Sequence, residues 1–366
     1  MNDKKRILLI AEKGLNKSGV PSLIMSLVRS LSYKYIFDIV VFNNDDFFTK
    51  EFLSFGGNIY HIKVNSGTSK LSKLLFYFLY SRKTTKQSKN IFKNQSYYAI
   101  HSFKEDQSFP FLKLARKNGI PIRIVHTNSY QVINSFKNLI YRFFLKIFTN
   151  KTIKYSTALI GPSENVCKSF FYKPINYYVV PNPYSSNIQY CDDFPSIAVL
   201  SITHIATFSD RKNQLFDIDL ISILISHGIN ANLNLVGKET ENGYLTKIKK
   251  RIADLKLENH VIFMPPNINQ KQLYKSTHIS ILPSKEEAFG IVAIESQAYG
   301  VHCFASNAVP PETNAGNISY LVLDPKIWAD QIKDFCKKGV FRKKVDLDSF
   351  SETEFAKRID KLYYQL

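Results

Sequence analysis

Short apolar runs alternate along the chain with segments whose apolar residues recur at helical spacing. The run RILLIA at 6–11 is followed by a segment, 19–31, with apolar residues three or four apart at Val20, Leu23, Ile24, Leu27, Val28 and Leu31. Further apolar runs occupy 37–43, 97–103, 122–127, 157–163 and 177–183. This pattern predicts parallel strands joined by helices.

The second half of the chain repeats the alternation after a polar, turn-rich stretch. We predict strands at 197–203, 231–237, 260–266 and 278–284, with helices near 213–227, 243–255 and 270–276. The intervening stretch, 185–196, is typical of a linker. An α/β protein of two units follows, and ligands of such sheets bind at the carboxyl ends of strands.

Composition supports a folded, basic protein. The 366 residues are 45% hydrophobic, which is enough for a sizeable core, and the net charge of +19 indicates an acidic partner such as a phosphorylated substrate, anionic lipid or nucleic acid. No motif that reads RNA or DNA accompanies this charge, so a nucleic-acid binder remains only an alternative. The four cysteines show no paired spacing, which favours reduced thiols over disulfides or zinc ligands.

The opening residues do not predict a secretion signal. The apolar run ILLIA is shorter than a signal peptide requires, and it fits a first buried strand better. No stretch approaches the roughly 18 apolar residues that span a bilayer. We therefore expect a cytoplasmic protein that touches a membrane surface.

The stretch SKEEAFGIVAIESQAYG, at 284–300, concentrates carboxylates around a Phe-Gly step. A helix that begins near Gly290 and ends at Gly300 would leave Glu287 in the preceding loop and carry Glu295 one turn inside. That arrangement lets both carboxylates face one cleft. A solvated helix start and a glycosidase-like carboxylate pair are the alternatives.

These residues resemble the signature of the retaining nucleotide-sugar glycosyltransferases of group 1 (family 4), in which Glu-x-Phe-Gly is followed by a Glu eight residues after the first. Glu287, Phe289, Gly290 and Glu295 match it, and the runs LNLVGK, HVIFMPP and ISILPS occur in the family's order. The resemblance covers nearly the whole chain, and 278–312 is its specific part. It implies the GT-B fold, with two facing Rossmann-like domains and an interdomain cleft.

The resemblance implies a domain plan. An acceptor-side domain spans 1–184 and a nucleotide-sugar domain spans 197–345, with the linker 185–196 between them. A closing helix at 346–366, in the tail DSFSETEFAKRIDKLY, is expected to pack back on the first domain.

The resemblance also assigns roles in the donor site. The amides of Phe289, Gly290, Ile291 and Val292, at a helix N-terminus, would bind the donor diphosphate. Glu295 would bind the ribose hydroxyls, and Glu287 would touch the transferred sugar. Gly237, in LNLVGK, is expected beside the donor.

The loop ATFSDRKNQ, at 206–214, departs from the family. The family has Gly-Arg followed by Lys five residues after the Arg, and both cations hold the diphosphate. Lys212 matches the Lys, whereas Thr207 stands in place of the Arg. A hydroxyl cannot replace a bidentate guanidinium, so we ask whether the adjacent Arg211 compensates. The alternative is a solvated basic loop.

The first half offers weaker candidates. GLNKSGVPS, at 14–22, lacks the Lys-Ser/Thr of a P-loop, and Gly19 matches the second glycine of a family loop that faces the cleft. His126 matches a family histidine near the reacting sugar. NNDD, at 43–46, imitates a metal-binding Asp-x-Asp motif, but the signature needs no metal and we expect neither metal nor cofactor.

Two basic stretches of the first half suit a membrane surface. In 135–148, the pattern places Phe136, Phe143 and Phe144 on one helix face, and SRKTTKQSKNIFK at 81–93 adds positive charge. Such a pattern more often marks a helix packed in the core. The alternative interpretation is a helix that contacts anionic lipid.

Together these features predict a retaining glycosyltransferase, peripheral on the inner face of the plasma membrane. It would move a sugar from a UDP- or GDP-type donor to a glycan or lipid-linked acceptor in bacterial surface polysaccharide synthesis. A GT-B binding module that has lost activity with the Arg is the main alternative.

Overall fold

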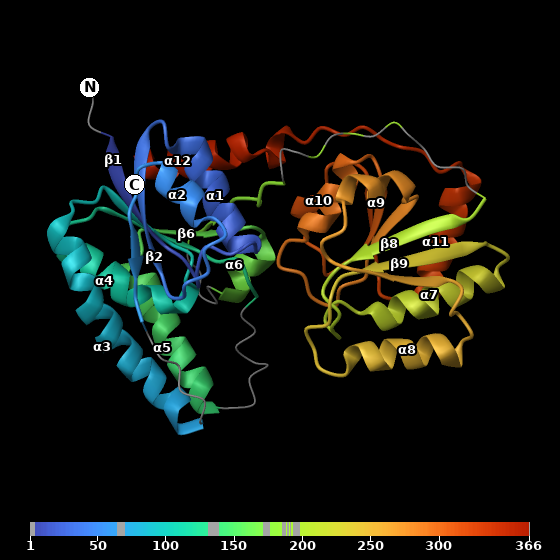
Figure 1. Ribbon diagram of the computed structural model, residues 1–366, viewed down its shortest axis with the longest axis horizontal. Helices are drawn as coiled ribbons and strands as arrows, with labels where there is room; N and C mark the ends of the chain where they lie inside the picture. Colours follow the sequence, from blue (N-terminus) through green and yellow to red (C-terminus); the bar gives the residue numbers. More distant parts are fainter. Residues whose placement is uncertain are drawn as a thin grey trace. The chain divides into compact units, whose positions relative to one another are not determined.

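The computed structural model describes residues 4–63, 70–130, 139–170, 176–184, 188, 190, 192 and 198–365. The chain forms two compact units, each with its own sheet and core (Figure 1). Unit 1 comprises Met1–Pro183 and Glu352–Leu366, and unit 2 comprises Tyr184–Ser351. Because the last helix returns to unit 1, unit 2 is inserted between two segments of unit 1.

Unit 1 is built on a seven-stranded parallel sheet in the order β3-β2-β1-β4-β5-β6-β7. Its strands are β1 (Lys5–Ile10), β2 (Tyr35–Val41), β3 (Ile59–His61), β4 (Ala99–Ser102), β5 (Ile122–His126), β6 (Ala158–Gly161) and β7 (Tyr178–Val179). Along β1, Ile7 and Leu9 join one apolar cluster while Leu8 and Ile10 join another. This alternation explains the unbroken apolar run, because both faces of the sheet are covered.

Helices cover the two faces of this sheet (Figure 1). On one face lie α1 (Gly19–Leu31), α2 (Thr49–Ser54) and α12 (Glu352–Gln365). On the other lie α3 (Lys70–Asn94), α4 (Phe109–Lys117), α5 (Leu139–Tyr155) and α6 (Glu164–Phe170). The short 3-10 turn η1 (Glu105–Ser108) connects β4 to α4. The closing helix α12 packs beside α1 through Phe355, Ile359 and Leu362.

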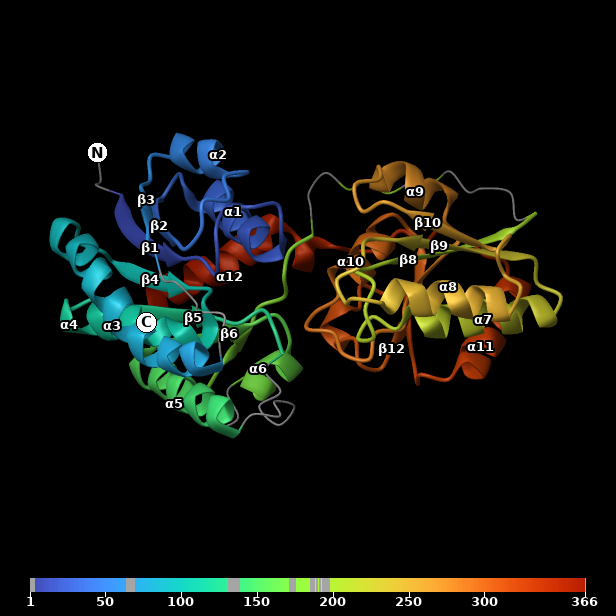
Figure 2. The same ribbon diagram turned by 60° about the horizontal axis from the view of Figure 1, so that its bottom comes forward.

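Unit 2 has a six-stranded parallel sheet in the order β10-β9-β8-β11-β12-β13. Its strands are β8 (Leu200–Ile205), β9 (Ala231–Val236), β10 (Val261–Met264), β11 (Ile279–Leu282), β12 (His302–Ser306) and β13 (Ile318–Leu321). Its helices are α7 (Gln214–Ser226), α8 (Tyr244–Asp254), α9 (Gln270–Ser276), α10 (Ile291–Ala298) and α11 (Pro325–Lys337). Figure 2 shows α7, α8 and α11 on one side of the sheet and α9 on the other.

Two predicted elements differ in the structure. The strand expected over 177–183 is reduced to Tyr178–Val179, since Pro181 and Pro183 have no N–H to donate to a ladder. The apolar face expected for 135–148 is also partly wrong, because Phe143 is 61% exposed. Helix α5 instead buries Leu145, Phe148 and Thr149, on the side that packs against α4 and η1; Phe136 lies outside the described residues.

Among the described residues, no helix combines the length and apolar character that crossing a membrane requires.

Candidate donor site at the second sheet

The strand order of unit 2 changes direction between β8 and β11, which are hydrogen-bonded neighbours. Connections run one way along the sheet from β8 and the other way from β11, so the loops after these two strands diverge at their carboxyl ends. Such a switch point is where open α/β sheets bind ligands. The two loops, 206–213 and 283–290, contain most of the residues that the sequence assigns to the donor.

Backbone and side-chain bonds tie the two loops together. The Lys285 amide donates to the Arg211 carbonyl at 2.8 Å, and the Asn213 side-chain amide donates to the Pro283 carbonyl at 3.2 Å. Asn213 has left-handed backbone angles, φ 64 and ψ 42, which asparagine tolerates better than most residues. The pair of loops therefore forms one cross-braced platform.

Lys212 and Glu287 meet across this platform. The Lys212 ammonium forms an ion pair with Glu287 Oε2, and the two side chains are only 14% and 10% exposed. The Ser284 hydroxyl donates to the same carboxylate oxygen at 3.1 Å, while Ser306 Oγ donates to the Ser284 carbonyl at 2.6 Å. The structure thus brings together the two residues that sequence reasoning assigned to phosphate and sugar.

Helix α10 begins directly after this pair. Gly290 has φ +93, and a Cβ there would come within 3.3 Å of Glu287 Cγ, so glycine suits both the backbone and the space. No side chain caps the helix N-terminus, and Ile291 and Val292 are half-buried. Phe289 is 3% exposed and anchored in an apolar cluster, which leaves its amide, not its ring, for a ligand.

Glu295 lies in the second turn of α10 and is half-buried. Burial raises the pKa of its carboxyl to about 7. No hydrogen bond joins it to Lys212 or Glu287 within the described part of the chain. Its assignment to ribose therefore stays a prediction, although a carboxyl with a raised pKa is a common mark of a ligand site.

The departure from the family pattern is visible in the loop after β8. Thr207 and Arg211 are both exposed, and the Thr207 carbonyl accepts from the Gln214 side chain at 3.1 Å. Across the described residues, the Arg211 guanidinium makes no hydrogen bond or ion pair. Lys212 is consequently the cation of this loop that the fold fixes in place.

The structure explains why position 237, directly after β9, is occupied by glycine. A Cβ there would lie 1.9 Å from the Ala206 carbonyl oxygen, so only glycine lets β9 approach the start of the 206–213 loop. Contact of Gly237 with a donor stays a prediction.

Sequence reasoning missed Ser284, Asn213 and Ser306, which position Glu287 and the two loops. Two of them had a usable signal. Asn213 opens the helix predicted near 213–227, and Ser284 ends the strand predicted at 278–284, at the edge where ligand sites form.

The candidates from the first half lie in unit 1. His126 ends β5, is fully buried, and stacks on Phe103 with ring centroids 5.0 Å apart. Neither ring nitrogen has a hydrogen-bond partner among the residues that the structure describes, and burial lowers the pKa of His126 to about 3, so the imidazole is neutral. Gly19 begins α1, and a Cβ there would meet open space. At Gly14, in the same loop, a Cβ would lie 1.9 Å from Asn43 Oδ1, so a larger residue would displace the Asn43 side chain.

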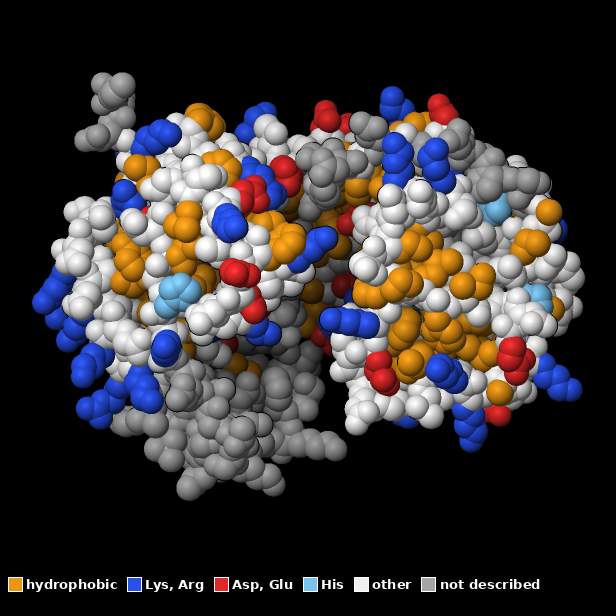
Figure 3. Space-filling view, in the orientation of Figure 1, with side chains coloured by type: hydrophobic (Ala, Val, Ile, Leu, Met, Phe, Trp, Pro, Cys, Tyr) orange, Lys and Arg blue, Asp and Glu red, His pale blue; other side chains and the backbone are white. Residues whose placement is uncertain are grey.

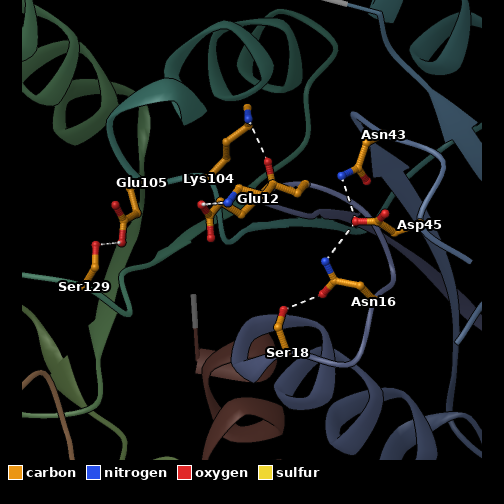
Figure 4. Close-up of polar contacts among 9 residues, drawn as sticks. Glu12, Asn16, Ser18, Asn43, Asp45, Lys104, Glu105 and Ser129 are labelled. Atoms are coloured by element: carbon orange, nitrogen blue, oxygen red, sulfur yellow. Dashed lines mark hydrogen bonds and ion pairs between the residues drawn. The ribbon is translucent and has the colours of Figure 1, made fainter. Parts of the chain in front are cut away.

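The NNDD stretch organises this loop through hydrogen bonds (Figure 4). Asp45 Oδ2 accepts from the amides of Asn16 and Asn43 at 2.9 and 2.8 Å. The Ser18 hydroxyl in turn bonds to Asn16. Asp45 therefore holds the loops after β1 and β2 together.

Comparison with known proteins locates this site within a family. Residues 200–346 match the model of the family described as glycosyl transferases, group 1. The protein EpsF of Bacillus subtilis (strain 168), named as a candidate glycosyltransferase, is 25% identical over 353 residues, which are 91% of this chain and 88% of EpsF.

Solved structures agree with the sequence match on the fold. Anabaena Alr3699/HepE, determined in complex with UDP, superposes with a TM-score of 0.75 at 14% identity, over 99% of this chain and 100% of that one. The lipopolysaccharide outer core galactosyltransferase WaaB, in its apo form, gives 0.74 at 16% identity, over 98% and 99%. The resemblance found in the sequence is thereby supported: residues 200–346 match the group 1 glycosyltransferases, and the whole chain has the GT-B fold.

Proposed function

We propose that the protein transfers a sugar, with retention of configuration, from a nucleotide diphosphate sugar to a glycan or lipid-linked acceptor in the assembly of a bacterial surface polysaccharide. The observation that carries the donor assignment is the Lys212–Glu287 pair beside the uncapped N-terminus of α10. Supporting it, HepE was solved with UDP, and WaaB is named as a lipopolysaccharide galactosyltransferase.

Two features of the site would attract the donor diphosphate, namely the N-terminus of α10 and the Lys212 ammonium. No side chain of the described residues caps the start of α10, and the helix dipole favours an anion there. Lys212 lies against the carboxylate of Glu287, three residues before that helix N-terminus. A diphosphate would compete with Glu287 for the Lys212 ammonium. Lys212 then stabilises the negative charge that grows on the leaving diphosphate.

When the diphosphate displaces Glu287 from Lys212, the Glu287 carboxylate becomes available to act on the sugar. The carboxylate remains oriented by the Ser284 hydroxyl, and we assign it to the point where the sugar joins the diphosphate. As the bond to the leaving group lengthens, positive charge develops at the anomeric carbon, and a nearby carboxylate stabilises it. Glu295, one turn along α10, is assigned to the ribose hydroxyls.

The test is a screen of UDP- and GDP-sugars by calorimetry with the full chain, followed by product analysis on lipid extracts. Lys212→Ala is compared with Lys285→Ala, which removes a lysine of the neighbouring loop whose partner is the exposed Asp210. We expect donor binding and transfer to be lost in the first variant and kept in the second. Donor binding without any turnover in the unmodified protein would instead indicate a binding module that lost activity with Thr207.

Peripheral contact with the inner face of the plasma membrane belongs to the same proposal. Helix α3 exposes five cations: Arg82, Lys83, Lys86, Lys89 and Lys93. Blue side chains gather at the lower left of Figure 3, on the side of unit 1 where Figure 1 draws α3. On α5, Phe143 is 61% exposed. Basic clusters of this size attract anionic lipid by about 1 kcal/mol per residue.

Vesicle sedimentation tests this contact. A triple change of Lys86, Lys89 and Lys93 to Gln should abolish binding to phosphatidylglycerol vesicles, and phosphatidylcholine vesicles should bind neither protein. The matched control changes three exposed lysines of α8, namely Lys247, Lys249 and Lys250. Equal loss in both triple variants would show that net charge, not α3, drives the binding.

A further inference from the structure

The hydroxyl of Tyr274, on α9, has no hydrogen-bond partner among the residues that the structure describes. The side chain is fully buried in unit 2, and its ring stacks on Tyr299 with centroids 4.7 Å apart. Other buried tyrosine hydroxyls of the chain bond to a neighbouring side chain, as those of Tyr35, Tyr97 and Tyr363 do. Because a buried tyrosine hydroxyl usually has such a partner, the one of Tyr274 requires an explanation.

The ring stack places Tyr274 against the end of α10. Tyr299 directly follows this helix, and its amide donates to the Glu295 carbonyl at 3.1 Å. Side chains four residues apart lie on the same face of a helix, so Glu295 and Tyr299 share the face that Tyr274 contacts. Figure 1 draws α9 and α10 next to each other, and Tyr274 belongs to the same apolar cluster as Ala298 and Tyr299.

The charges around this hydroxyl favour a bond from Tyr274 to Glu295. Burial raises the pKa of Tyr274 well above its usual range, and the Glu295 carboxylate raises it further, ahead of Cys303 and Tyr299. The hydroxyl therefore keeps its proton at neutral pH and can donate it. Arg342, the cation at this end of α9, donates to the backbone carbonyl of Tyr274 at 2.6 Å.

Glu295 in turn lacks a donor. Burial raises the pKa of its carboxyl to about 7, and within the described ranges no group donates a hydrogen bond to that carboxyl. A carboxylate that must bind ribose hydroxyls in a buried place has to be ionised, and a donated hydrogen bond favours the ionised form. The unpaired hydroxyl and the carboxyl without a donor thus complement each other.

We propose that Tyr274 is a positioning residue of the donor site, whose hydroxyl donates to one oxygen of the ionised Glu295 carboxylate and leaves the other oxygen to accept from the ligand. This inference rests on the proposed assignment of Glu295 to the ribose hydroxyls. It goes beyond that assignment by naming the group that stabilises the charge of Glu295 and fixes its orientation.

An NMR titration of the free protein tests the contact between the two side chains. The carboxyl signals of ¹³C-labelled glutamate are followed between pH 5 and pH 9 in the full chain, and the Glu295 signal is identified by its loss in Glu295→Gln. Tyr274→Phe should move the titration of Glu295 to higher pH, by about one pH unit, because the ionised form loses its donor. Tyr244→Phe removes a buried hydroxyl of the same unit, on α8, and should leave that titration in place.

Nucleotide binding tests what the contact does for the ligand. In calorimetry with UDP, or with GDP if the screen selects guanine, Tyr274→Phe should bind about fivefold more weakly at pH 7. The difference should narrow towards pH 8.5, where Glu295 becomes ionised in both proteins, whereas a change in packing would weaken binding by the same factor at every pH. Turnover at saturating donor should stay within about twofold, since Glu295 is assigned to the ribose and not to the transferred sugar.

A double-mutant cycle separates a positioning role from a structural one. In a Glu295→Ala background, Tyr274→Phe should have no further effect on nucleotide affinity, because no carboxylate remains to be positioned. Equal weakening in both backgrounds, or an unshifted titration of Glu295, would overturn the inference. Unchanged nucleotide affinity in Glu295→Ala alone would instead overturn the ribose assignment, and the NMR titration would still decide whether Tyr274 holds the carboxylate.

Discussion

In unit 2, the Lys212 ammonium at the switch point pairs with the carboxylate of a neighbouring loop, beside an uncapped helix N-terminus. In unit 1, the Lys104 ammonium donates instead to a backbone carbonyl and covers an aromatic ring, while the Glu105 carboxylate accepts from the Ser129 hydroxyl. The two sheets have the same kind of strand reversal. The same topology therefore gives both sheets a switch point, while the side chains placed there differ in their partners.

The comparison is tested most strongly by removing the lysine of unit 2. Lys212→Ala should lower turnover by a factor of about 100 or more, because the leaving diphosphate loses its fixed cation and Glu287 is left with an unpaired, mostly buried charge. Steady-state kinetics with the donor found in the screen measures it. Lys285→Ala should stay within about twofold of the unmodified protein, and an equal loss in both variants would remove Lys212 from the site.

A change of Glu287, the ion-pair partner of Lys212, should affect turnover and not nucleotide affinity. Glu287→Gln should lower turnover by about tenfold to a hundredfold while nucleotide affinity stays constant or rises, since the diphosphate no longer competes with a carboxylate for Lys212. Calorimetry with the nucleotide diphosphate and single-turnover rates separate the two effects. Equal losses of affinity and rate would mean that Glu287 acts on the nucleotide.

Variants of Thr207 and Arg211 test whether the phosphate site of unit 2 lacks a second cation. Thr207→Arg should strengthen donor binding by about tenfold, because a guanidinium can bind two phosphate oxygens at once. Arg211→Ala should have a smaller effect, since the Arg211 side chain is exposed and unattached among the described residues. Donor titrations of both variants decide it. If Arg211→Ala is as damaging as Lys212→Ala, Arg211 already supplies the missing cation.

The smallest expected effect is a pH dependence from Glu295. Its pKa of about 7 in the free protein means that the carboxyl is mostly protonated at pH 6 and mostly ionised at pH 8. Ribose hydroxyls donate to the ionised form, so nucleotide-sugar affinity should increase by up to about tenfold from pH 6 to pH 8. Glu295→Gln should show a flat profile. A profile of the same slope in that variant would assign the titration to another group.

Much of the fold could be predicted because local patterns decide it. The apolar spacing of 19–31 gave α1 with the bounds that the structure has, and the runs that became β1 and β9 are covered on both faces, as parallel strands are. The face of α5 could not be predicted, because burial of Leu145 rather than Phe143 depends on where α4 and η1 pack. The same holds for Gly14, because its close approach to Asn43 joins two loops that are separate in the sequence.

The residues of the candidate site also divide into those that the sequence could predict and those that it could not. Glu287 and Lys212 could be named from family spacing, and their ion pair follows from β8 and β11 being neighbours. Asn213 was missed because its role depends on a contact with Pro283, 70 residues away in sequence. Ser284 was missed because its bond to Glu287, three residues later, depends on the conformation of their loop. Tyr274 was also missed, since its place beside α10 depends on how α9 packs and leaves no pattern in the sequence.

The central claim is that Lys212 binds the diphosphate at the switch point of unit 2. The most direct measurement is a calorimetric cycle with UDP and uridine, or GDP and guanosine if the screen selects guanine, against the unmodified chain and Lys212→Ala. The account predicts that the variant binds the diphosphate about 10 to 100 times more weakly, with nucleoside affinity unchanged. Equal affinity of both proteins for the diphosphate, or an equal loss for the nucleoside, would contradict it.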